Sequence, residues 1–406
     1  MNIIIFTENN RAGGMDTFYT NLIKSWPNVN DKFIFICNKS HPGLKYLDKE
    51  FSGNLKMIKH SIILNWDINW VNRINFIIIQ KIIRKLLVYL LLPYQFISIK
   101  KLLNNYEASS LISVNGAHPG GQTTRLANIA WKSLNKGKSI YSLHGLSLYN
   151  VINKPSKLLI FFEKYMTTKL IKSTDSLVCV SNACANSLND HPGYINDKTK
   201  VISNGINLEQ KASNLNLKDL LKLNKDTKIL LMLAGYHLNK GHSHVFKAMN
   251  IVLKKYPDCH LVMCGDSKEP EKDIIQDELE KTLKNTENIH LLDYVPNASA
   301  LIEQADILLI ATQTTEAFGL TALEAMKYKK PIVSTDVDAL RETIGQEGYA
   351  GYCCKKNDYT LYAQKIIYLL DNPSIRKQMG LNGNKRLKER FDSKKMSKEY
   401  QSLLSK

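Results

Sequence analysis

The sequence predicts an α/β protein built from two doubly wound domains, each a parallel sheet covered by helices. First, short apolar runs alternate with helical patterns along the chain, and such alternation produces parallel sheets with right-handed crossovers. Second, the alternation starts again at about residue 201 and continues beyond a polar stretch. Third, a chain of 406 residues is long enough to bury two separate cores.

The first half of the chain contains apolar runs that predict strands. The run at residues 2–6 is followed by Gly13-Gly14 and by a helical pattern from Thr17 to about Trp26. This order, strand then glycine turn then helix, is the first crossover unit of the predicted sheet. The remaining strands are expected at residues 33–37, 111–114, 139–143 and 176–180.

The second half repeats the pattern after a connection. Residues 207–228 are polar and rich in Asn, Lys and Leu, so we interpret them as the link between the domains. Strands are then expected at residues 229–234, 260–264, 289–292, 307–311 and 332–334. The predicted domains are residues 1–206 and 207–385, and a helix at 386–406 is expected to pack back toward the first domain. Two such halves are expected to leave a cleft that faces the carboxyl ends of both sheets.

The composition is that of an ordinary globular protein with a strong excess of positive charge. Hydrophobic residues make up 44% and charged residues 23%, and the formal net charge is +18. This balance favours anionic partners such as nucleic acid, phosphorylated substrates or an acidic membrane surface. Because no low-complexity tail or zinc-finger spacing concentrates the charge, we expect no nucleic-acid partner.

The cysteines and the N-terminal residues predict a cytoplasmic protein. The seven cysteines are odd in number and most lie in or beside apolar runs, as buried free thiols do in a reducing compartment. The chain opens on an apolar strand rather than on a basic region and a cleavage site, so no signal peptide is expected.

One segment, residues 75–92, approaches the apolar character of a membrane helix. It falls short of about 18 uninterrupted apolar residues, because Lys81, Arg84 and Lys85 interrupt it. One interpretation is a core helix of the first domain. The other is an amphipathic helix in peripheral contact with an anionic membrane, which Trp66 and Trp70 just upstream favour.

Three features after predicted strands are candidates for a functional site, two of them for binding a phosphate. Gly13-Gly14 lets the backbone approach a phosphate at a helix N-terminus, although a tight turn without ligand has the same sequence. Lys240 places a flexible cation where a diphosphate can lie, or else is simply solvated. His144 follows the strand at 139–143 at the mouth of the expected cleft, or else is a structural histidine.

The sharpest candidates are Glu316 and Glu324, eight positions apart around a glycine turn. If a helix begins near Gly319, Glu316 precedes it and Glu324 lies one to two turns inside. The unpaired N–H groups of residues 318–321 then point at the ligand. The alternative is a helix that merely carries acidic residues near its start.

Asp336 and Asp338 match a DxD pattern that binds metals in other proteins. No third carboxylate or histidine stands beside them, so we interpret the pattern as a polar loop and expect no metal.

Together these residues resemble the retaining glycosyltransferases of the GT-B fold that form glycosyltransferase family 4, also called glycosyl transferases group 1. The resemblance covers nearly the whole chain and is strongest over residues 201–351. The glutamate pair in this context is specific, whereas the glycine pair is not. The matching landmarks are Gly13-Gly14, His144, Val-Ile-Ser-Asn-Gly-Ile-Asn at 201–207, Lys240-Gly241, Cys-Gly-Asp at 264–266, Asp306-Ile307 and the Glu316–Glu324 pair.

The resemblance implies an acceptor-binding first domain and a second domain that binds a nucleotide-sugar donor, with no further cofactor. Glu324 looks like the glutamate that holds the ribose, and Glu316 like the one that contacts the donor sugar. Lys240, helped by Gly13 and Gly14, would neutralise the diphosphate, and His144 would touch the sugar near the reacting centre. Further donor contacts are implied for Ala317, Phe318, Gly319, Leu320 and Thr321, and for Tyr294 and Val295 beside the base.

One departure concerns the phosphate site. Many relatives carry an arginine after the glycine equivalent to Gly235, and this chain has Tyr236. Either Lys240 carries most of the neutralisation alone, or another cation replaces the arginine.

The implied activity is metal-independent, retaining transfer of a hexose to a hydroxyl of a growing cell-surface polysaccharide, as in lipopolysaccharide or capsule, or of a lipid-linked glycan. The site would be cytoplasmic, with the enzyme peripheral on the inner membrane face. The alternatives are a GT-B sugar-nucleotide epimerase or other nucleotide-sugar enzyme, and a non-enzymatic two-lobed binding protein.

Overall fold

The computed structural model describes residues 1–406 except 12, 52–54, 74–75, 148, 150–155, 210–215, 267–270, 296–297 and 406. Its contacts divide the chain into unit 1, Met1–Ile202 with Ser397–Lys406, and unit 2, Ser203–Met396. Each unit contains one parallel sheet, so the predicted class of two doubly wound, Rossmann-like domains is confirmed.

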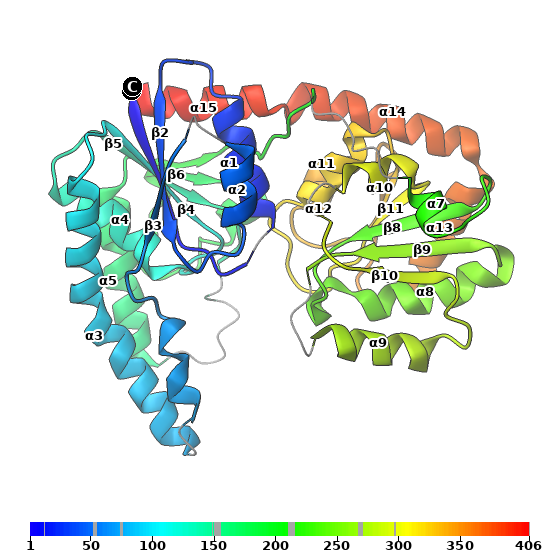
Figure 1. The fold of residues 1–406 in the computed structure, drawn as a ribbon, viewed down its shortest axis with the longest axis horizontal. Helices are drawn as coiled ribbons and strands as arrows, with labels where there is room; N and C mark the ends of the chain where they lie inside the picture. The colour runs from blue at the N-terminus through cyan, green and yellow to red at the C-terminus, as the bar shows by residue number, and fades with distance from the viewer. Residues whose placement is uncertain are drawn as a thin grey trace. The chain divides into compact units, whose positions relative to one another are not determined.

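Unit 1 contains, in its described residues, a seven-stranded sheet in the order β3-β2-β1-β4-β5-β6-β7 (Figure 1). The chain starts at the centre with β1, moves outward to β3, and returns to the other side of β1 with β4. The place where this order reverses, between β1 and β4, is where doubly wound sheets bind ligands. The strands are β1 (Asn2–Thr7), β2 (Lys32–Asn38), β3 (Lys56–His60), β4 (Ser110–Asn115), β5 (Lys138–Leu143), β6 (Ser176–Cys179) and β7 (Thr199–Val201).

The helices of unit 1 connect these strands and close its core. Trp131 of α4 packs with Ile99 and Leu103 of α3, and with Ile4 and Phe6 of β1, so both helices are fixed to the sheet by apolar burial. The helices are α1 (Gly14–Lys24), α2 (Leu44–Glu50), α3 (Ile77–Asn104), α4 (Gln122–Ser133), α5 (Lys157–Ser173) and α6 (Asn182–Asn186), with short 3₁₀ helices η1 (Asp67–Arg73) and η3 (Asn196–Lys198).

Unit 2 repeats the design with a six-stranded sheet in the order β10-β9-β8-β11-β12-β13. Its order reverses between β8 and β11. Met232, Phe246 and Leu309 belong to its core, which joins the sheet to α8 and α13. The strands are β8 (Lys228–Leu233), β9 (Cys259–Cys264), β10 (Ile289–Leu292), β11 (Ile307–Ile310), β12 (Ile332–Thr335) and β13 (Gly351–Cys354). The helices are α7 (Leu217–Leu220), η4 (Leu238–Lys240), α8 (His242–Lys255), α9 (Glu271–Thr282), α10 (Ser299–Gln304), α11 (Leu320–Lys327), α12 (Leu340–Ile344) and α13 (Tyr359–Asp371).

The last part of the chain forms two helices, α14 (Pro373–Arg390) and α15 (Ser393–Ser405). At their junction, the Ile206 N–H donates to Phe391 O over 3.0 Å, and the Ser393 N–H donates to Ile206 O. Gly205 lies so close to this junction that a Cβ would be 2.7 Å from the carbonyl carbon of Asp392. Gly205 and Ile206 of the family pattern therefore have a structural role in unit 2, against the α14–α15 junction. In unit 1, Ser397 of α15 donates to Leu22 O over 2.9 Å.

All seven cysteines are buried and free, which confirms the prediction of buried free thiols.

Candidate functional site

The switch point of unit 2 brings two of the predicted residues together. β8 and β11 are neighbours in the sheet, so the loops that follow them emerge side by side. The Gln313 N–H donates to Asn239 O over 3.0 Å and links the two loops. Lys240 Nζ then lies 3.2 Å from Glu316 Oε2, and both side chains are partly exposed. An amine and a carboxylate thus share the edge where doubly wound sheets hold phosphorylated ligands.

Gly241 makes this approach of the loops feasible. Its φ of +80° lies in the left-handed region, and a Cβ at this position would be 1.9 Å from the carbonyl oxygen of Ala311. Only glycine fits such close backbone contact. The sequence Lys240-Gly241 therefore places the lysine at the start of α8 and against the loop that carries Glu316.

The backbone of Glu316 is held from a distant loop. The Glu316 N–H donates to Asp338 Oδ2 over 2.9 Å, and the Ala339 N–H donates to Glu316 O over 3.2 Å. Asp336 binds Arg341 through two hydrogen bonds. Both carboxylates of the DxD pattern are thus used by the protein itself. Among the described residues, no group of three or more His, Cys, Asp and Glu side chains is suited to hold a metal ion.

The turn after Glu316 leads into α11 through Gly319, whose φ is +87°. Ala317 and Phe318 are buried, and the Phe318 ring meets Phe391 edge-on at 5.6 Å. Buried apolar side chains thus fix the turn, while its N–H groups lie at the start of a helix, where the partial positive charge of the dipole is concentrated. Leu320 and Thr321, the first residues of α11, are half-buried.

Glu324 lies in the second turn of α11, as the sequence predicts, and its side chain accepts no hydrogen bond within the described part of the chain. Burial raises the pKa of its carboxyl to about 7, although nearby Lys327 opposes that shift. Lys327 Nζ instead donates to Asn207 O over 2.8 Å. A half-buried carboxyl without a hydrogen-bond donor is costly for a fold, so it is a natural place for ligand hydroxyl groups.

Tyr236 stands where many relatives have an arginine, and its side chain lies in the core of unit 2. Its hydroxyl donates to Leu292 O over 2.7 Å and lies 3.0 Å from Met263 O. This position therefore supplies no cation to a ligand, and Lys240 is the described cation that contacts Glu316.

Tyr294 and Val295 belong to a different loop of unit 2 from those that carry Lys240 and Glu316. They follow β10, the edge strand two places from β8; Tyr294 is exposed and Val295 half-buried. Residues 296–297 of the same loop lie outside the described residues.

The glycine pair of unit 1 forms the start of α1, beside the switch point between β1 and β4. Gly13 is the N-cap, and its N–H already donates to Asp16 Oδ2 over 2.9 Å. Asp16 in turn lies 2.8 Å from His41 Nε2. The Asp16 carboxylate thus occupies one N–H group of this helix N-terminus, whereas Gly14 is exposed.

His144 follows β5, and two hydroxyl groups and an aromatic ring fix its imidazole. Nε2 lies 2.9 Å from Ser142 Oγ, which lies 2.6 Å from the Tyr400 hydroxyl of α15. The Phe18 ring packs against the imidazole with 4.1 Å between ring centroids. Burial lowers the pKa of His144 to about 3, so the ring is neutral at physiological pH.

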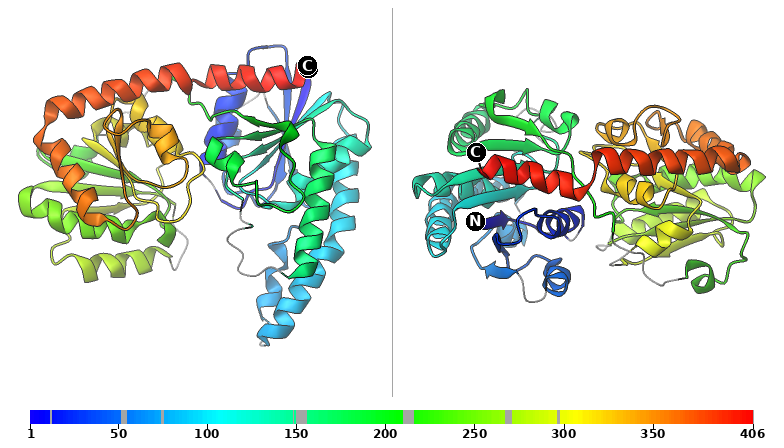
Figure 2. Two further views of the ribbon diagram at one scale, coloured as in Figure 1. Left: turned by 180° about the vertical axis from the view of Figure 1, so that it is seen from behind. Right: turned by 90° about the horizontal axis from the view of Figure 1, so that it is seen from above.

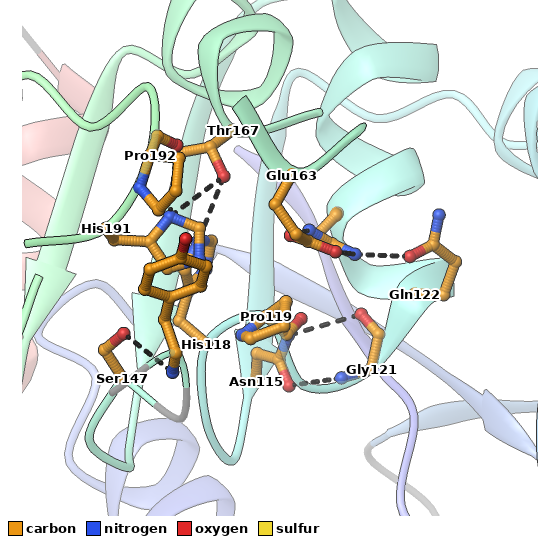
Figure 3. Close-up of polar contacts among 12 residues, drawn as sticks. Asn115, His118, Pro119, Gly121, Gln122, Ser147, Glu163, Thr167, His191 and Pro192 are labelled. Carbon is orange, nitrogen blue, oxygen red and sulfur yellow. Dashed lines mark hydrogen bonds and ion pairs between the residues drawn. The ribbon is translucent and has the colours of Figure 1, made fainter. Parts of the chain in front are cut away.

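Sequence reasoning did not single out a polar cluster around the loop after β4 (Figure 3). Asn115 accepts the Gly121 N–H over 2.9 Å and holds the loop closed. His118 Nε2 lies 3.3 Å from Thr167 Oγ1, which lies 3.4 Å from His191 Nδ1. The signal in the sequence is Asn-Gly-Ala-His-Pro-Gly-Gly directly after an apolar strand, which marks a tight polar turn at the switch point of unit 1.

Two family models match this chain. The model described as Glycosyl transferases group 1 matches residues 215–386, and the model described as Glycosyltransferase Family 4 matches residues 12–210. The chain belongs to glycosyltransferase family 4. The family resemblance seen in the sequence is thereby confirmed, and the match over residues 215–386 contains the whole Lys240–Glu316–Glu324 region.

Relatives of this family-4 chain include proteins of different activities. N-acetyl-alpha-D-glucosaminyl L-malate synthase of Bacillus anthracis is 29% identical over 187 residues, 46% of this chain and only 48% of that protein. The capsular polysaccharide biosynthesis glycosyltransferase CapM of Staphylococcus aureus is 25% identical over 272 residues, 65% of this chain and 69% of that protein. Anabaena HepE in complex with UDP-glucose matches with a TM-score of 0.74 at 15% identity over 100% of this chain and 99% of that one, which shows the GT-B fold.

Proposed function

We propose that this family-4 protein is a retaining hexosyltransferase that moves a sugar from a nucleotide-sugar donor to a hydroxyl of a cell-surface polysaccharide or lipid-linked glycan. The observation that carries the proposal is the Lys240–Glu316 pair at the switch point of unit 2. The pair stands beside a helix N-terminus and, one turn into that helix, a carboxyl whose pKa burial raises to about 7. A cation, helix N–H groups and a hydroxyl acceptor match the diphosphate, sugar and ribose of such a donor.

The donor, in this proposal, exchanges the internal ion pair for contacts of its own. Lys240 turns to the diphosphate, and Glu316 turns to hydroxyl groups of the donor sugar together with the N–H groups of residues 317–321. Glu324 accepts the ribose hydroxyl groups, and Tyr294 with Val295 borders the base. In unit 1, Gly14 is the better candidate for a phosphate contact, because Gly13 already donates its N–H to Asp16.

The chemistry follows from where charge develops. As the bond between sugar and diphosphate breaks, the sugar becomes oxocarbenium-like and the leaving diphosphate gains negative charge. Lys240 and the fixed N–H dipoles at α11 stabilise that charge. Retention then proceeds by attack of the acceptor hydroxyl on the same face, with the leaving phosphate taking its proton. This route requires no nucleophilic carboxylate, unlike that of retaining glycosidases, and in our proposal no metal.

Unit 1 is the proposed acceptor domain. The Nε2 atom of His191 and the Nε2 atom of Gln122 are buried without a hydrogen-bond partner in the described part of the chain. Burial keeps the pKa of both His118 and His191 below the ordinary value, so the cluster offers neutral hydrogen-bonding groups rather than charges. The relative CapM, a glycosyltransferase of capsular polysaccharide biosynthesis, supports a surface-glycan acceptor.

The proposal predicts that a nucleotide sugar stabilises the protein and is turned over. In a thermal-shift screen of nucleotide sugars, beginning with UDP-glucose, one donor is expected to raise the Tm, because a ligand at a hundred times its Kd stabilises the folded state by about 2.7 kcal/mol. That donor should release nucleoside diphosphate when acceptor glycan is added, equally with and without EDTA. Interconversion of nucleotide sugars without acceptor, or binding without any turnover, would point instead to an epimerase or a binding protein.

A second prediction concerns the fixed, neutral ring of His144. We expect His144→Ala to lower kcat about tenfold, because a positioned hydrogen-bonding group near the sugar is lost. Tyr400→Phe should lower kcat less, by about threefold, because it removes only the hydroxyl that holds Ser142. His144 stays neutral above about pH 4. We therefore expect no inflection near pH 6.5 in the wild-type profile of kcat that is lost in these variants. Finding such an inflection would show that the histidine acts as a titrating acid or base.

A further inference from the structure

Helix α3 packs against the core of unit 1 along one side and carries exposed apolar residues along another. The stretch Leu86–Asn104 is long and apolar enough, by length and composition alone, to cross a membrane. One side of it, however, belongs to the core of unit 1: Ile99 and Leu103 are fully buried, and Gln95 Nε2 donates to Ile63 O over 2.9 Å. The helix therefore lies along unit 1. Of the predicted segment 75–92, residue 75 and the side chains of Lys81, Arg84 and Lys85 lie outside the description.

The side of α3 opposite its core contacts carries an exposed apolar stripe. Leu90 is 71% exposed and Ile97 65%. At 3.6 residues per turn, positions spaced by three, four or seven share one side of a helix. Ile79, Leu86, Leu90, Tyr94 and Ile97 follow these spacings, and all are exposed.

Helix α5 carries a second stripe of the same kind. Leu158, Phe161 and Tyr165 are spaced by three and four, and Phe161 is 70% exposed. The acidic residue of α5, Glu163, points the other way, since it is buried in an ion pair with Arg125 at 2.7 Å.

The two stripes lie on the same side of the helix pair. Tyr89 of α3 meets Phe162 of α5 edge-on at 4.8 Å, and both helices end beside the start of β5, so they run in parallel and side by side (Figure 2). The parallel course follows from two bonds near that strand: Lys136 Nζ donates to Leu103 O, and the Asp175 N–H donates to Ser139 O. Tyr89 lies one residue before Leu90 and Phe162 one residue after Phe161. With parallel helices these offsets turn both stripes toward one common face, which we call the α3–α5 face.

The charges on the α3–α5 face are positive. Lys101 continues the stripe of α3, and Lys169 and Lys172 continue that of α5; all three are exposed. The sequence of α3 contains no Asp or Glu, and the Glu163 of α5 is buried. The lysines follow the apolar stretch toward the C-terminal ends of both helices, while exposed Trp70 and Phe76 precede α3. Aromatic side chains and lysine stems beside apolar surface are typical of groups that sit at a lipid–water boundary.

We propose that the α3–α5 face docks on the surface of an anionic bilayer, with its apolar stripes in the headgroup and upper acyl region and Lys101, Lys169 and Lys172 on the phosphates. This inference deepens the proposed function, because it would hold the enzyme where lipid-linked or growing surface glycans are presented. A bilayer suits the face better than a second copy of the chain, because the lysines described on it would repel those of a second copy. Shallow insertion of an apolar stripe flanked by lysines is how interfacial helices bind.

The test is flotation of the full chain with vesicles of phosphatidylcholine alone or with added phosphatidylglycerol. We expect binding only to the anionic vesicles. The double variant Leu90→Ser/Phe161→Ser should weaken binding at least about tenfold, since two large exposed side chains no longer enter the bilayer. The double variant Lys169→Glu/Lys172→Glu should weaken it by a similar factor or more, because each lysine near an anionic surface contributes about 1 kcal/mol.

Matched control variants distinguish membrane binding through this face from nonspecific hydrophobic or electrostatic binding. Val29→Ser/Leu381→Ser removes two exposed apolar side chains elsewhere, and Lys254→Glu/Lys284→Glu changes the net charge by the same amount. Both controls should bind vesicles as the wild type does. All variants should keep the same Tm, because every substituted side chain is exposed.

The outcome is independent of the proposed activity, since turnover with a soluble acceptor should be equal in the wild type and in all of these variants. No flotation of the wild type, or flotation that the face variants leave unchanged, would overturn the inference while leaving the activity standing. A dimer in sedimentation that Leu90→Ser/Phe161→Ser dissociates would overturn it in favour of an interface between two copies.

Discussion

Replacing Lys240 by methionine is expected to lower kcat by about 10²–10³-fold. Lys240 stands at the edge of the sheet, at the switch point between β8 and β11. Position 236, which precedes it, is a tyrosine buried in the core and not an arginine. In the proposed mechanism, one ammonium group therefore stabilises a large share of the charge that develops on the leaving diphosphate. Loss of a single preorganised group of this kind costs a few kcal/mol of transition-state stabilisation in other enzymes.

The same substitution should leave the folded state almost unchanged. The Lys240–Glu316 pair is partly exposed on both sides, and such ion pairs contribute about 0–1 kcal/mol. Methionine keeps most of the apolar stem of lysine. Steady-state release of nucleoside diphosphate measures kcat, and thermal unfolding measures stability. Lys247→Met, an exposed lysine on α8, is the matched control and should keep wild-type kcat.

A double-mutant cycle shows whether the two residues act on one donor. In the absence of donor Lys240 and Glu316 neutralise each other, and each must leave the other to meet the ligand. We therefore expect Glu316→Ala to abolish most of the release of nucleoside diphosphate, and the double variant to be little slower than the slower single one. Full kcat in both single variants would show that the donor binds elsewhere.

The short apolar runs predict most strands of both sheets, and the strands they miss are short or at an edge. β3, Lys-Met-Ile-Lys-His, has two apolar residues between two lysines, because an edge strand is half solvated, and its sequence therefore resembles a polar segment. β13, Gly-Tyr-Cys-Cys, lacks β-branched residues, yet it pairs along β12 from Gly351 to Cys354. Its Gly351 is so close to Ile332 O that a Cβ would lie at 2.2 Å. Tertiary packing, which a local pattern does not encode, places such strands.

The candidate site likewise combines residues that local patterns predict with residues that only tertiary packing brings near. The strand, turn and helix patterns of the sequence predict Lys240, Glu316 and Glu324 as candidate residues, because their placement depends on local structure. The groups that hold such residues do not follow from these patterns: Asp338 lies 22 residues from Glu316, whose N–H it binds, and Tyr400 lies 258 residues from Ser142. The sequence of α3 also does not predict which side of the helix faces solvent, because apolar residues lie on several of its sides.

Glu324→Gln is expected to weaken donor binding and to stabilise the unliganded protein. Two ribose hydroxyl groups donate more strongly to a carboxylate than to an amide, and hydrogen bonds to a charged group are worth about 1.5–3 kcal/mol. The KM for the donor should therefore rise about tenfold to a hundredfold. The unliganded wild type, in contrast, has a half-buried carboxyl without a hydrogen bond in its described residues, and the variant relieves that cost.

The pH dependence has a definite sign. Burial raises the carboxyl pKa from 4.5 to about 7, so the folded protein binds more protons than the unfolded chain between these values. Wild-type stability should fall as pH rises through this window, by an amount on the order of 1–3 kcal/mol. The glutamine variant lacks this loss. The two proteins should have similar unfolding free energies near pH 4.5, and the variant should be the more stable at pH 8.

Donor binding should show the opposite trend, because the ribose favours the ionised carboxyl. Below about pH 7 the wild-type KM is expected to rise as Glu324 takes up a proton, whereas the KM of the variant stays level. The diphosphate of a nucleotide sugar is esterified at both ends and does not titrate in this range, so it does not contribute to the change. Chemical denaturation at pH 4.5 and 8, with KM from pH 5.5 to 8.5, measures both effects. Glu389→Gln, an exposed glutamate of α14, is the control. A variant that loses stability at pH 8 and binds donor as the wild type does would show that Glu324 serves the fold and not the ribose.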